Sequence, residues 1–205
     1  MQGIEVFDRL ACEYDQWFDR HPEVYQAEME TLRRLLPDNG AGVEIGAGTG
    51  RFALPLGAML GIEPSLPMAR IARHRGLPTV QAVGEHLPLP DGCFDFTLLV
   101  TVICFVTDVP TLLRETGRIL RPGGRIVVGL IDLATPLGRL YESRRAADPF
   151  YRHARFYTAD AVIAMLEQAG FRAPVAYQAM IGLPGEPQDD IAVQPGYGAG
   201  GFVGI

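Results

Sequence analysis

Lysine is missing from this sequence: all 18 basic residues are arginines, and no stretch holds more than two in a row. The formal net charge is −6. A protein that binds nucleic acid normally carries a basic patch that neutralises the phosphates. We therefore expect no nucleic-acid partner for this chain.

Cysteine is scarce and long apolar stretches are absent. Cys12, Cys93 and Cys104 form no C-x-x-C pair, which argues against a disulfide framework or a zinc site and favours a reducing compartment. The longest apolar stretch, Phe96 to Val106, is too short to span a bilayer. The N-terminal residues show no signal-peptide core. We expect a cytoplasmic protein that needs neither a membrane nor a metal.

Helical and strand patterns alternate along the chain. Apolar spacing and helix-start signals predict helices at 4–18, 22–36, 49–60, 65–75, 107–120 and 158–170. Short apolar runs predict strands at 43–45, 61–62, 79–83, 94–101, 126–131, 171–180 and 200–205. Thr49, Ser65 and Thr158 are the predicted N-caps. Residues 182–198, rich in proline and glycine, are expected to form a loop.

The stretch from Val43 to Gly50 carries the strongest functional signal. Its apolar residues suit a buried strand, and its glycines suit a tight turn whose backbone approaches a ligand closely. In an open α/β sheet, ligands bind at this end of a strand. A dinucleotide-binding loop has the spacing G-x-G-x-x-G, but Arg51 stands where its third glycine belongs.

Two acids accompany this loop. Glu63 follows the second predicted strand, where a carboxylate can grip the two hydroxyls of a ribose. Glu44 lies at the end of the first strand and suits a cationic or amino-bearing ligand. A nucleoside ligand without a diphosphate fits these features better than a dinucleotide does.

The series Glu44-x-Gly46-x-Gly48-x-Gly50 resembles motif I of the class I S-adenosylmethionine-dependent methyltransferases. Residues 7–17 resemble the "FD-x-x-A-x-x-YD" opening of many small-molecule members, in which this segment folds over the cofactor. The resemblance implies that Tyr14 faces the cofactor and Trp17 the acceptor. An ordinary core role for this aromatic stripe stays open.

Residues 84–95 resemble "GDAEDLPFPDGSFD", a signature of the type 11 methyltransferase-domain family. In that family the loop's backbone and an acid bind the adenine edge. Val83 stands where the family often has aspartate, so the backbone at Gly84 and Glu85 is expected to serve instead. The helix that starts at Ser65 carries Met68, for which two interpretations stay open: contact with the adenine, or packing.

The resemblance spans residues 5–205 and implies an α/β fold. This is a doubly wound Rossmann-like, seven-stranded, mostly parallel sheet with an antiparallel last strand and an N-terminal helical cap. Length and composition favour a single domain. Within the domain 1–205 we expect the cap at 1–38, the cofactor-binding half at 41–131, an acceptor-site lid at 132–157 and the C-terminal half of the sheet at 158–205.

The implied reaction is in-line transfer of a methyl group from S-adenosylmethionine to a small-molecule acceptor, leaving S-adenosylhomocysteine. No residue is assigned as catalytic. The implied cofactor-binding residues are Tyr14, Glu44, Gly46, Ala47, Gly48, Gly50, Glu63, Pro64, Met68, Gly84, Glu85 and Thr101. The implied acceptor-binding residues are Trp17, Phe105 and Tyr141.

Two features bear on the acceptor. After the strand at 94–101 the chain has neither the N/D-P-P-Y motif of amino-methylating DNA enzymes nor the Pro-Cys of cytosine C5 enzymes. Residues 132–157 interleave five arginines with aromatic side chains. Inward-pointing arginines would suit an acceptor with a carboxylate or phosphate; an exposed helix with snorkelling arginines is the alternative.

Two other functions stay open on the sequence alone. One is a nucleotide-dependent oxidoreductase with a degenerate glycine loop. The other is a protein that binds S-adenosylmethionine or S-adenosylhomocysteine without turnover, as a regulator or scaffold. The sequence does not specify the acceptor, the methylated atom, the use of a general base or the oligomeric state.

Overall fold

The computed structural model describes residues 3–186 and 191–205. The helices are α1 (Ile4–Arg9), α2 (Ala11–Arg20), α3 (Pro22–Arg33), α4 (Leu66–His74), α5 (Val109–Ile119), α6 (Pro136–Arg144) and α7 (Ala159–Gln168), with short 3-10 turns η1 (Ile103–Phe105) and η2 (Arg145–Ala147). The strands are β1 (Gly42–Ile45), β2 (Ala58–Ile62), β3 (Thr79–Val80), β4 (Phe94–Val100), β5 (Leu120–Ile131), β6 (Tyr177–Ala179), β7 (Val193–Pro195) and β8 (Phe202–Gly204).

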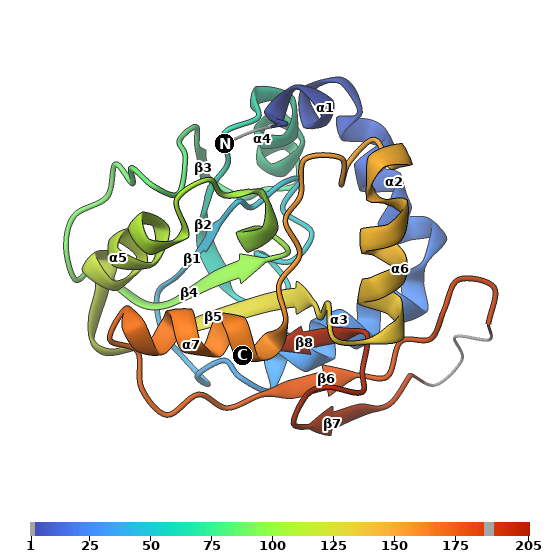
Figure 1. Ribbon diagram of the computed structural model, residues 1–205. Helices are drawn as coiled ribbons and strands as arrows, with labels where there is room; N and C mark the ends of the chain where they lie inside the picture. The colour runs from blue at the N-terminus through green and yellow to red at the C-terminus, as the bar shows by residue number, and fades with distance from the viewer. Residues whose placement is uncertain (1–2, 187–190) are drawn as a thin grey trace.

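The eight strands of the described residues form one sheet in the order β3-β2-β1-β4-β5-β8-β6-β7 (Figure 1). The strands from β3 to β5 pair in parallel. β8 lies antiparallel between β5 and β6, and β7 is antiparallel to β6. The chain starts at β1, moves outward to β3, and then returns to β4 on the other side of β1. This reversal places a topological switch point beside β1, where open α/β sheets bind ligands.

Helices cover both faces of the sheet. One apolar cluster joins the sheet to α5 and α7, through residues such as Leu112 and Val162. A second joins the other face to α3 and α4, through residues such as Leu32 and Ala72. In β4, Leu99 belongs to the first cluster while Leu98 and Val100 belong to the second, so the strand is buried on both faces, as parallel strands are.

The carboxyl ends of the parallel strands are covered by the N-terminal helices and by α6. In Figure 1 the arrowheads of β4 and β5 point toward α6 and α2, which stand across that edge of the sheet. Helices from two distant parts of the chain therefore cover the carboxyl ends of the parallel strands.

The predicted fold class is confirmed, and the local signals for several elements are confirmed with it. Ser65 accepts a hydrogen bond from the Met68 amide at the start of α4, and Thr158 accepts one from the Ala161 amide at the start of α7. Both are the expected N-caps. Cys104 is buried, in the apolar stretch that the sequence shows from Phe96 to Val106.

Several details of the prediction are wrong. The helix expected at 49–60 is absent: residues 51–57 form turns and β2 begins at Ala58. Pro55 has no amide to donate, which disfavours a helix here, and the early start of β2 leaves no room for one. Thr49 caps no helix and instead donates a hydrogen bond to Asp15. The helix expected at 4–18 is divided at Leu10.

Within the part of the chain that the structure describes, the sheet has one strand more than the seven expected. The additional strand, β7, lies within the predicted loop 182–198 and pairs with the edge strand β6. Residues 187–190 of that loop lie outside the described residues.

Candidate functional site

A cavity of about 480 Å³ lies at the carboxyl ends of the parallel strands. Its floor includes Gly46 and Gly48 after β1, Glu63 after β2 and Thr101 after β4. Its walls come from α1, α2, α3, η1 and α6, and from segments at 148–151 and 181–185. Volumes of this size are typical of pockets that bind small ligands.

Glu63 is held firmly at the floor. The Gly48 amide donates to its Oε2 and the Ser65 amide to its Oε1, both at 2.8 Å. Burial raises the pKa of Glu63 to about 7, and the two backbone hydrogen bonds only partly offset that effect. Each carboxylate oxygen can accept more than one hydrogen bond. Glu63 can therefore still accept hydrogen bonds from a ligand.

Gly48 borders a narrow slot. Its φ of 54° lies in the left-handed region that favours glycine. A Cβ at this position would lie 3.5 Å from the Met68 methyl group and 3.6 Å from the Tyr14 ring. The absent side chain thus leaves the loop backbone facing a gap bounded by these two side chains.

Thr101 marks the end of β4 with an unusual backbone conformation. Its φ is 52°, which is rare for a β-branched residue. Its amide donates to the Gly129 carbonyl of β5 at 2.8 Å, and this bond holds the strained residue in place. Strain of this kind clusters at ligand-binding positions.

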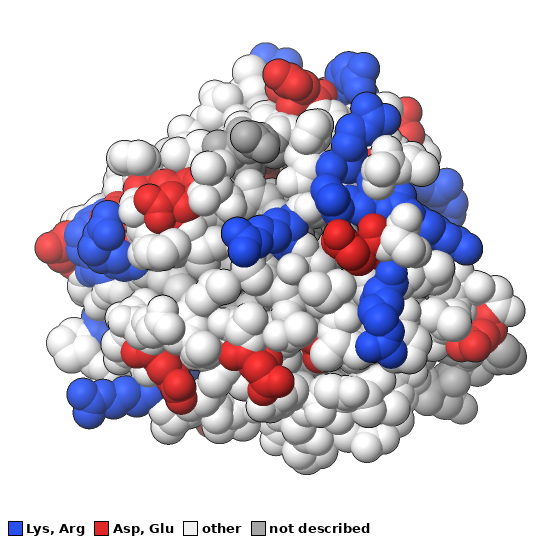
Figure 2. Space-filling view, in the orientation of Figure 1, with Lys and Arg blue, Asp and Glu red and all other residues white. Residues whose placement is uncertain are grey.

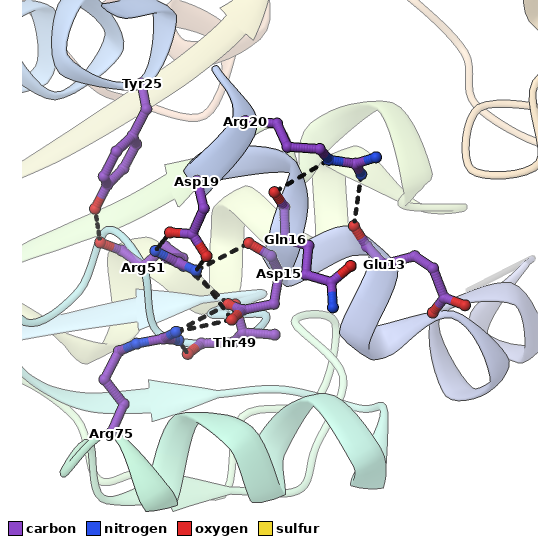
Figure 3. Close-up of polar contacts among 9 residues, drawn as sticks. All are labelled: Glu13, Asp15, Gln16, Asp19, Arg20, Tyr25, Thr49, Arg51 and Arg75. Atoms are coloured by element: carbon purple, nitrogen blue, oxygen red, sulfur yellow. Dashed lines mark hydrogen bonds and ion pairs between the residues drawn. The ribbon is translucent and has the colours of Figure 1, made fainter. Parts of the chain in front are cut away.

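A cluster of charges fastens α2 over the glycine loop (Figure 3). Asp15 accepts hydrogen bonds from Thr49 at 2.6 Å, from Arg51 at 2.9 Å and from Arg75 at 3.0 Å. Burial disfavours the ionised form of Asp15, but these hydrogen bonds outweigh that effect and lower its pKa to about 2. Arg51 also pairs with Asp19 at 2.7 Å.

α1 has its own attachment, because Asp8 accepts a hydrogen bond at 2.7 Å from Ser65, next to Glu63. The two N-terminal helices are thus tied to different points, α1 to the start of α4 and α2 to the glycine loop.

Aromatic side chains form much of the remaining wall. The Tyr14 ring packs edge-on against Phe7 and Phe18, with centroids 5.9 and 5.4 Å away. Trp17 stacks on His21 at 4.6 Å, and farther along the wall other rings line the cavity from the η1 and α6 side. Those rings are Phe105, Tyr141, Phe150 and Tyr151.

Most of the residues proposed from the sequence meet at this one cavity. The proposed cofactor-binding residues that line it are Tyr14, Gly46, Gly48, Glu63, Pro64, Met68 and Thr101. The proposed acceptor-binding residues Trp17, Phe105 and Tyr141 line it as well. Segments from across the chain, from α2 to α6, therefore share one concave site.

The other five proposed residues do not line the cavity. Glu44 is buried beneath the loop, where the Ala53 amide hydrogen-bonds to it and burial raises its pKa well above the ordinary value. Gly84 fits closely against Leu112 and Ile45, where a Cβ would clash. The remaining residues are Ala47, Gly50 and Glu85. Cofactor contact by these five stays a prediction.

The arginines of 132–157 do not point into the cavity. Arg139, Arg144, Arg152 and Arg155 are exposed, and none of the five arginines in this segment lines the cavity. The idea that they grip an anionic acceptor is wrong. On the face shown in Figure 2, basic side chains gather on the side where α6 lies and are interleaved with acids.

Sequence reasoning missed Glu28, a buried residue of α3 that lines the cavity. The available signal was an acid on an otherwise apolar helix face, one turn from Val24 and one turn from Leu32. The side chains of Phe7, Phe150 and Tyr151 were also not assigned to the site.

The described part of the chain lacks two kinds of feature, a metal-binding cluster and a membrane-spanning helix. Residues 3–186 and 191–205 contain no group of three or more His, Cys, Asp or Glu side chains placed to hold a metal ion. Within the same ranges, no helix combines the length and the apolar character needed to cross a bilayer.

Comparison with known proteins gives consistent results. The model of a family described as a methyltransferase domain matches residues 43–128. An uncharacterized protein of Methanocaldococcus jannaschii is 42% identical over 98% of both chains. A malonyl-[acyl-carrier protein] O-methyltransferase of Geobacter sulfurreducens is 32% identical, over 82% of this chain and 69% of that protein.

A solved structure from Thermotoga maritima is similar along nearly the whole chain. It is described as an S-adenosylmethionine-dependent methyltransferase and possible histamine N-methyltransferase. Its TM-score is 0.95 at 42% identity, and the match covers 99% of this chain and 97% of that one.

Proposed function

The chain belongs to the S-adenosylmethionine-dependent methyltransferases, and from that premise we propose that it methylates a small-molecule acceptor bound in the cavity described above. S-adenosylmethionine supplies an activated methyl group on a sulfonium centre. The protein's part is to hold the donor and the acceptor in line and to exclude water. Such orientation is worth about 7–11 kcal/mol of a reaction barrier.

The donor half of the cavity is the part between the glycine loop and the end of β2. In this proposal Glu63 accepts hydrogen bonds from the ribose hydroxyls, the Gly48 backbone lies against the ligand, and Tyr14 and Met68 bound the slot. The residues fit the ligand because the Glu63 carboxylate faces the cavity with hydrogen-bonding capacity left and because the slot over Gly48 has room that a side chain would fill.

The acceptor half lies beyond Thr101, between η1 and α6. The single observation that carries the proposal is the continuity of the space: one cavity runs from Gly48 and Glu63 to the aromatic wall that contains Phe105 and Tyr141. A reactant held against that wall would share one enclosed volume with the donor. Trp17 of α2 completes the boundary, so cap and lid both contribute.

The enclosure favours a small acceptor over a macromolecule. The cavity volume of about 480 Å³ and the helices that wall it suit a small molecule better than a polymer. The T. maritima relative is described as a possible histamine N-methyltransferase, which is a small-molecule activity. These points support the class of acceptor and leave its identity to experiment.

The test is a labelling experiment with S-adenosylmethionine that carries a radioactive methyl group. The protein is incubated with a cell extract divided by ultrafiltration into low-mass and macromolecular fractions. We expect label in the low-mass fraction, with little transfer by a Glu63→Gln variant. Transfer only to the macromolecular fraction would contradict a small-molecule acceptor, and no transfer to either fraction would contradict turnover under these conditions.

A further inference from the structure

Glu28 is a buried acidic residue with no role in the methyl transfer proposed above. Its exposure is only 8%, and it lines the cavity from α3. Within residues 3–186 and 191–205, its carboxylate has no hydrogen-bond or ion-pair partner that affects its pKa. Burial alone raises its pKa to about 8. A carboxylate desolvated in this way without a partner is costly, and a ligand that provides one would recover the cost.

The position of Glu28 assigns it to the acceptor half. Its helix, α3, packs against β5, β6 and β8, whereas Glu63 follows β2. In the sheet, β1 and β4 lie between β2 and β5. The two carboxylates therefore approach the cavity from opposite sides of the switch point, with Glu28 on the side away from the ribose position.

Phenols lie near enough to Glu28 for its charge to act on them. A negative charge on Glu28 contributes to raising their pKa values, although burial is the larger cause. These phenols are Tyr14, Tyr25, Tyr141 and Tyr151. Aromatic faces attract cations, so the ring-lined wall and the carboxylate favour the same kind of ligand.

Acids dominate the ionisable lining of the cavity. The described lining residues include four acids and two basic residues. The acids are Glu13, Glu28, Glu63 and Asp148, and the basic residues are Arg20 and His21. Arg20 and His21 are exposed, and Arg20 donates to the backbone carbonyls of Gln16 and Glu13 rather than to Glu28. The net charge of −6 also favours the approach of a cation over that of an anion.

We infer that Glu28 binds a basic nitrogen of the acceptor, and that the acceptor is a small amine with an apolar body packed against the aromatic wall. This inference rests on the proposed small-molecule methyl transfer. An ammonium group supplies N–H donors and the opposite charge, so it satisfies the carboxylate directly. Glu28 thus selects amines over neutral molecules of the same shape.

The test compares amines with alcohols of the same skeleton. Isobutylamine is paired with isobutanol, and 2-phenylethylamine with 2-phenylethanol. Their affinities for the protein saturated with S-adenosylhomocysteine are measured by calorimetry. Trp17 is the only tryptophan of the chain and lines the cavity, so its emission gives a second readout. We expect at least one amine to bind about tenfold or more tightly than its alcohol.

Variants identify the residue responsible. Glu28→Gln keeps the size and should abolish the preference for the amine, and Glu28→Leu, which suits the apolar helix face, should do the same. Glu23→Gln changes an exposed acid of the same helix and should keep the preference. In the parent protein the preference should grow from about pH 7 to about pH 9 as Glu28 ionises, and the Gln variant should lack this change.

Two failures are distinguishable. If S-adenosylhomocysteine binds but no amine is preferred, or if Glu28→Gln keeps the preference, the inference is wrong and the proposed function stands. If S-adenosylhomocysteine itself does not bind, or methyl label enters only macromolecules, the proposed function fails. Thermal melting of each variant shows whether it is folded before its affinities are compared.

Discussion

Glu63 and Glu28 face one cavity but differ in what holds them. Glu63 already accepts two backbone hydrogen bonds, from Gly48 and Ser65, so its position is fixed before a ligand arrives. Glu28 makes no such bond within the described residues and depends on the ligand for a partner. The first carboxylate therefore suits a ligand common to the family, and the second suits selection among acceptors.

Replacing Glu63 tests the ribose contact. Glu63→Gln removes the negative charge. It also places the glutamine NH₂ group, which is a donor, opposite one of the two backbone amides that donate to Glu63 in the parent protein. Hydrogen bonds to a charged group contribute about 1.5–3 kcal/mol, so affinity for S-adenosylhomocysteine should fall about tenfold or more. Calorimetric titration measures this effect. Glu167→Gln, at an exposed site on α7, is the control and should bind as the parent does.

The ionisation of Glu63 predicts a pH dependence. Its pKa is about 7 without ligand, and ribose hydroxyls donate best to the ionised form. Binding should therefore lower this pKa, and affinity for S-adenosylhomocysteine should rise from about pH 6 to about pH 8. The profile of the Glu63→Gln variant should be flat relative to the parent's. A parallel rise in both proteins would show that another group is responsible.

Among the elements, α2 depends most visibly on one side chain. Asp15 ties α2 to the glycine loop through Thr49 and Arg51 and to the end of α4 through Arg75. Asp15→Asn should leave two arginines poorly paired and lower the free energy of unfolding by about 1–2 kcal/mol, since the site is only partly buried. Urea denaturation measures the loss.

The same variant should loosen α2 selectively. Amides of α2 should exchange hydrogen faster than in the parent protein, while amides of β4 stay protected, because α2 is held from the side and β4 lies in the core. Asp19→Asn is the matched control: Asp19 binds the same Arg51 but is exposed, so little change is expected. Equal effects of the two variants would contradict the role given to Asp15.

Elements stabilised by residues close in the sequence could be predicted from the sequence, and elements that depend on distant residues could not. Ser65 caps α4 within three residues of itself, so the sequence alone indicated it. The partners of Asp15 lie 34 to 60 residues away along the chain, and no local pattern shows them. The helix expected at 49–60 was not formed because β2 starts early, at Ala58, and this start depends on how the strand pairs within the sheet.

At the scale of the whole molecule, buried acids set the response to pH. Burial raises the pKa of Glu63 to about 7 and of Glu28 to about 8. Groups whose pKa is raised on folding stabilise the protein below their unfolded pKa, and that contribution is lost as pH rises through the folded value. Asp15 and Glu115, whose pKa values fall to about 2, act in the opposite sense at low pH.

The unliganded protein should therefore be most stable at about pH 5. Its melting temperature should fall as pH rises from about 5 to about 8, because the unfolded chain then loses protons that the buried Glu28 and Glu63 still hold in the folded protein. Differential scanning calorimetry checks this trend. The fall should be smaller for Glu28→Gln, which has no carboxylate to ionise at that position. A melting temperature that climbs over this range would contradict the account.

The architecture was predictable in outline for two reasons. Strand and helix patterns alternate along the chain, and the single glycine loop marks the end of the first strand. The floor of the site followed from it: strand ends that carry Gly48, Glu63 and Thr101 meet at one edge of a parallel sheet. Glu28 could not be placed in the same way. Its exposure to the cavity depends on how α3 docks on β5, β6 and β8, which sequence spacing does not specify.

The most direct test of the central claim is a crystal structure of the complex with S-adenosylhomocysteine. The account predicts that both ribose hydroxyls lie within hydrogen-bonding distance of the Glu63 carboxylate and that the backbone of Gly48 contacts the ligand. It also predicts that the sulfur faces the half of the cavity bounded by Phe105 and Tyr141. A ligand bound elsewhere, or a ribose turned away from Glu63, would contradict it.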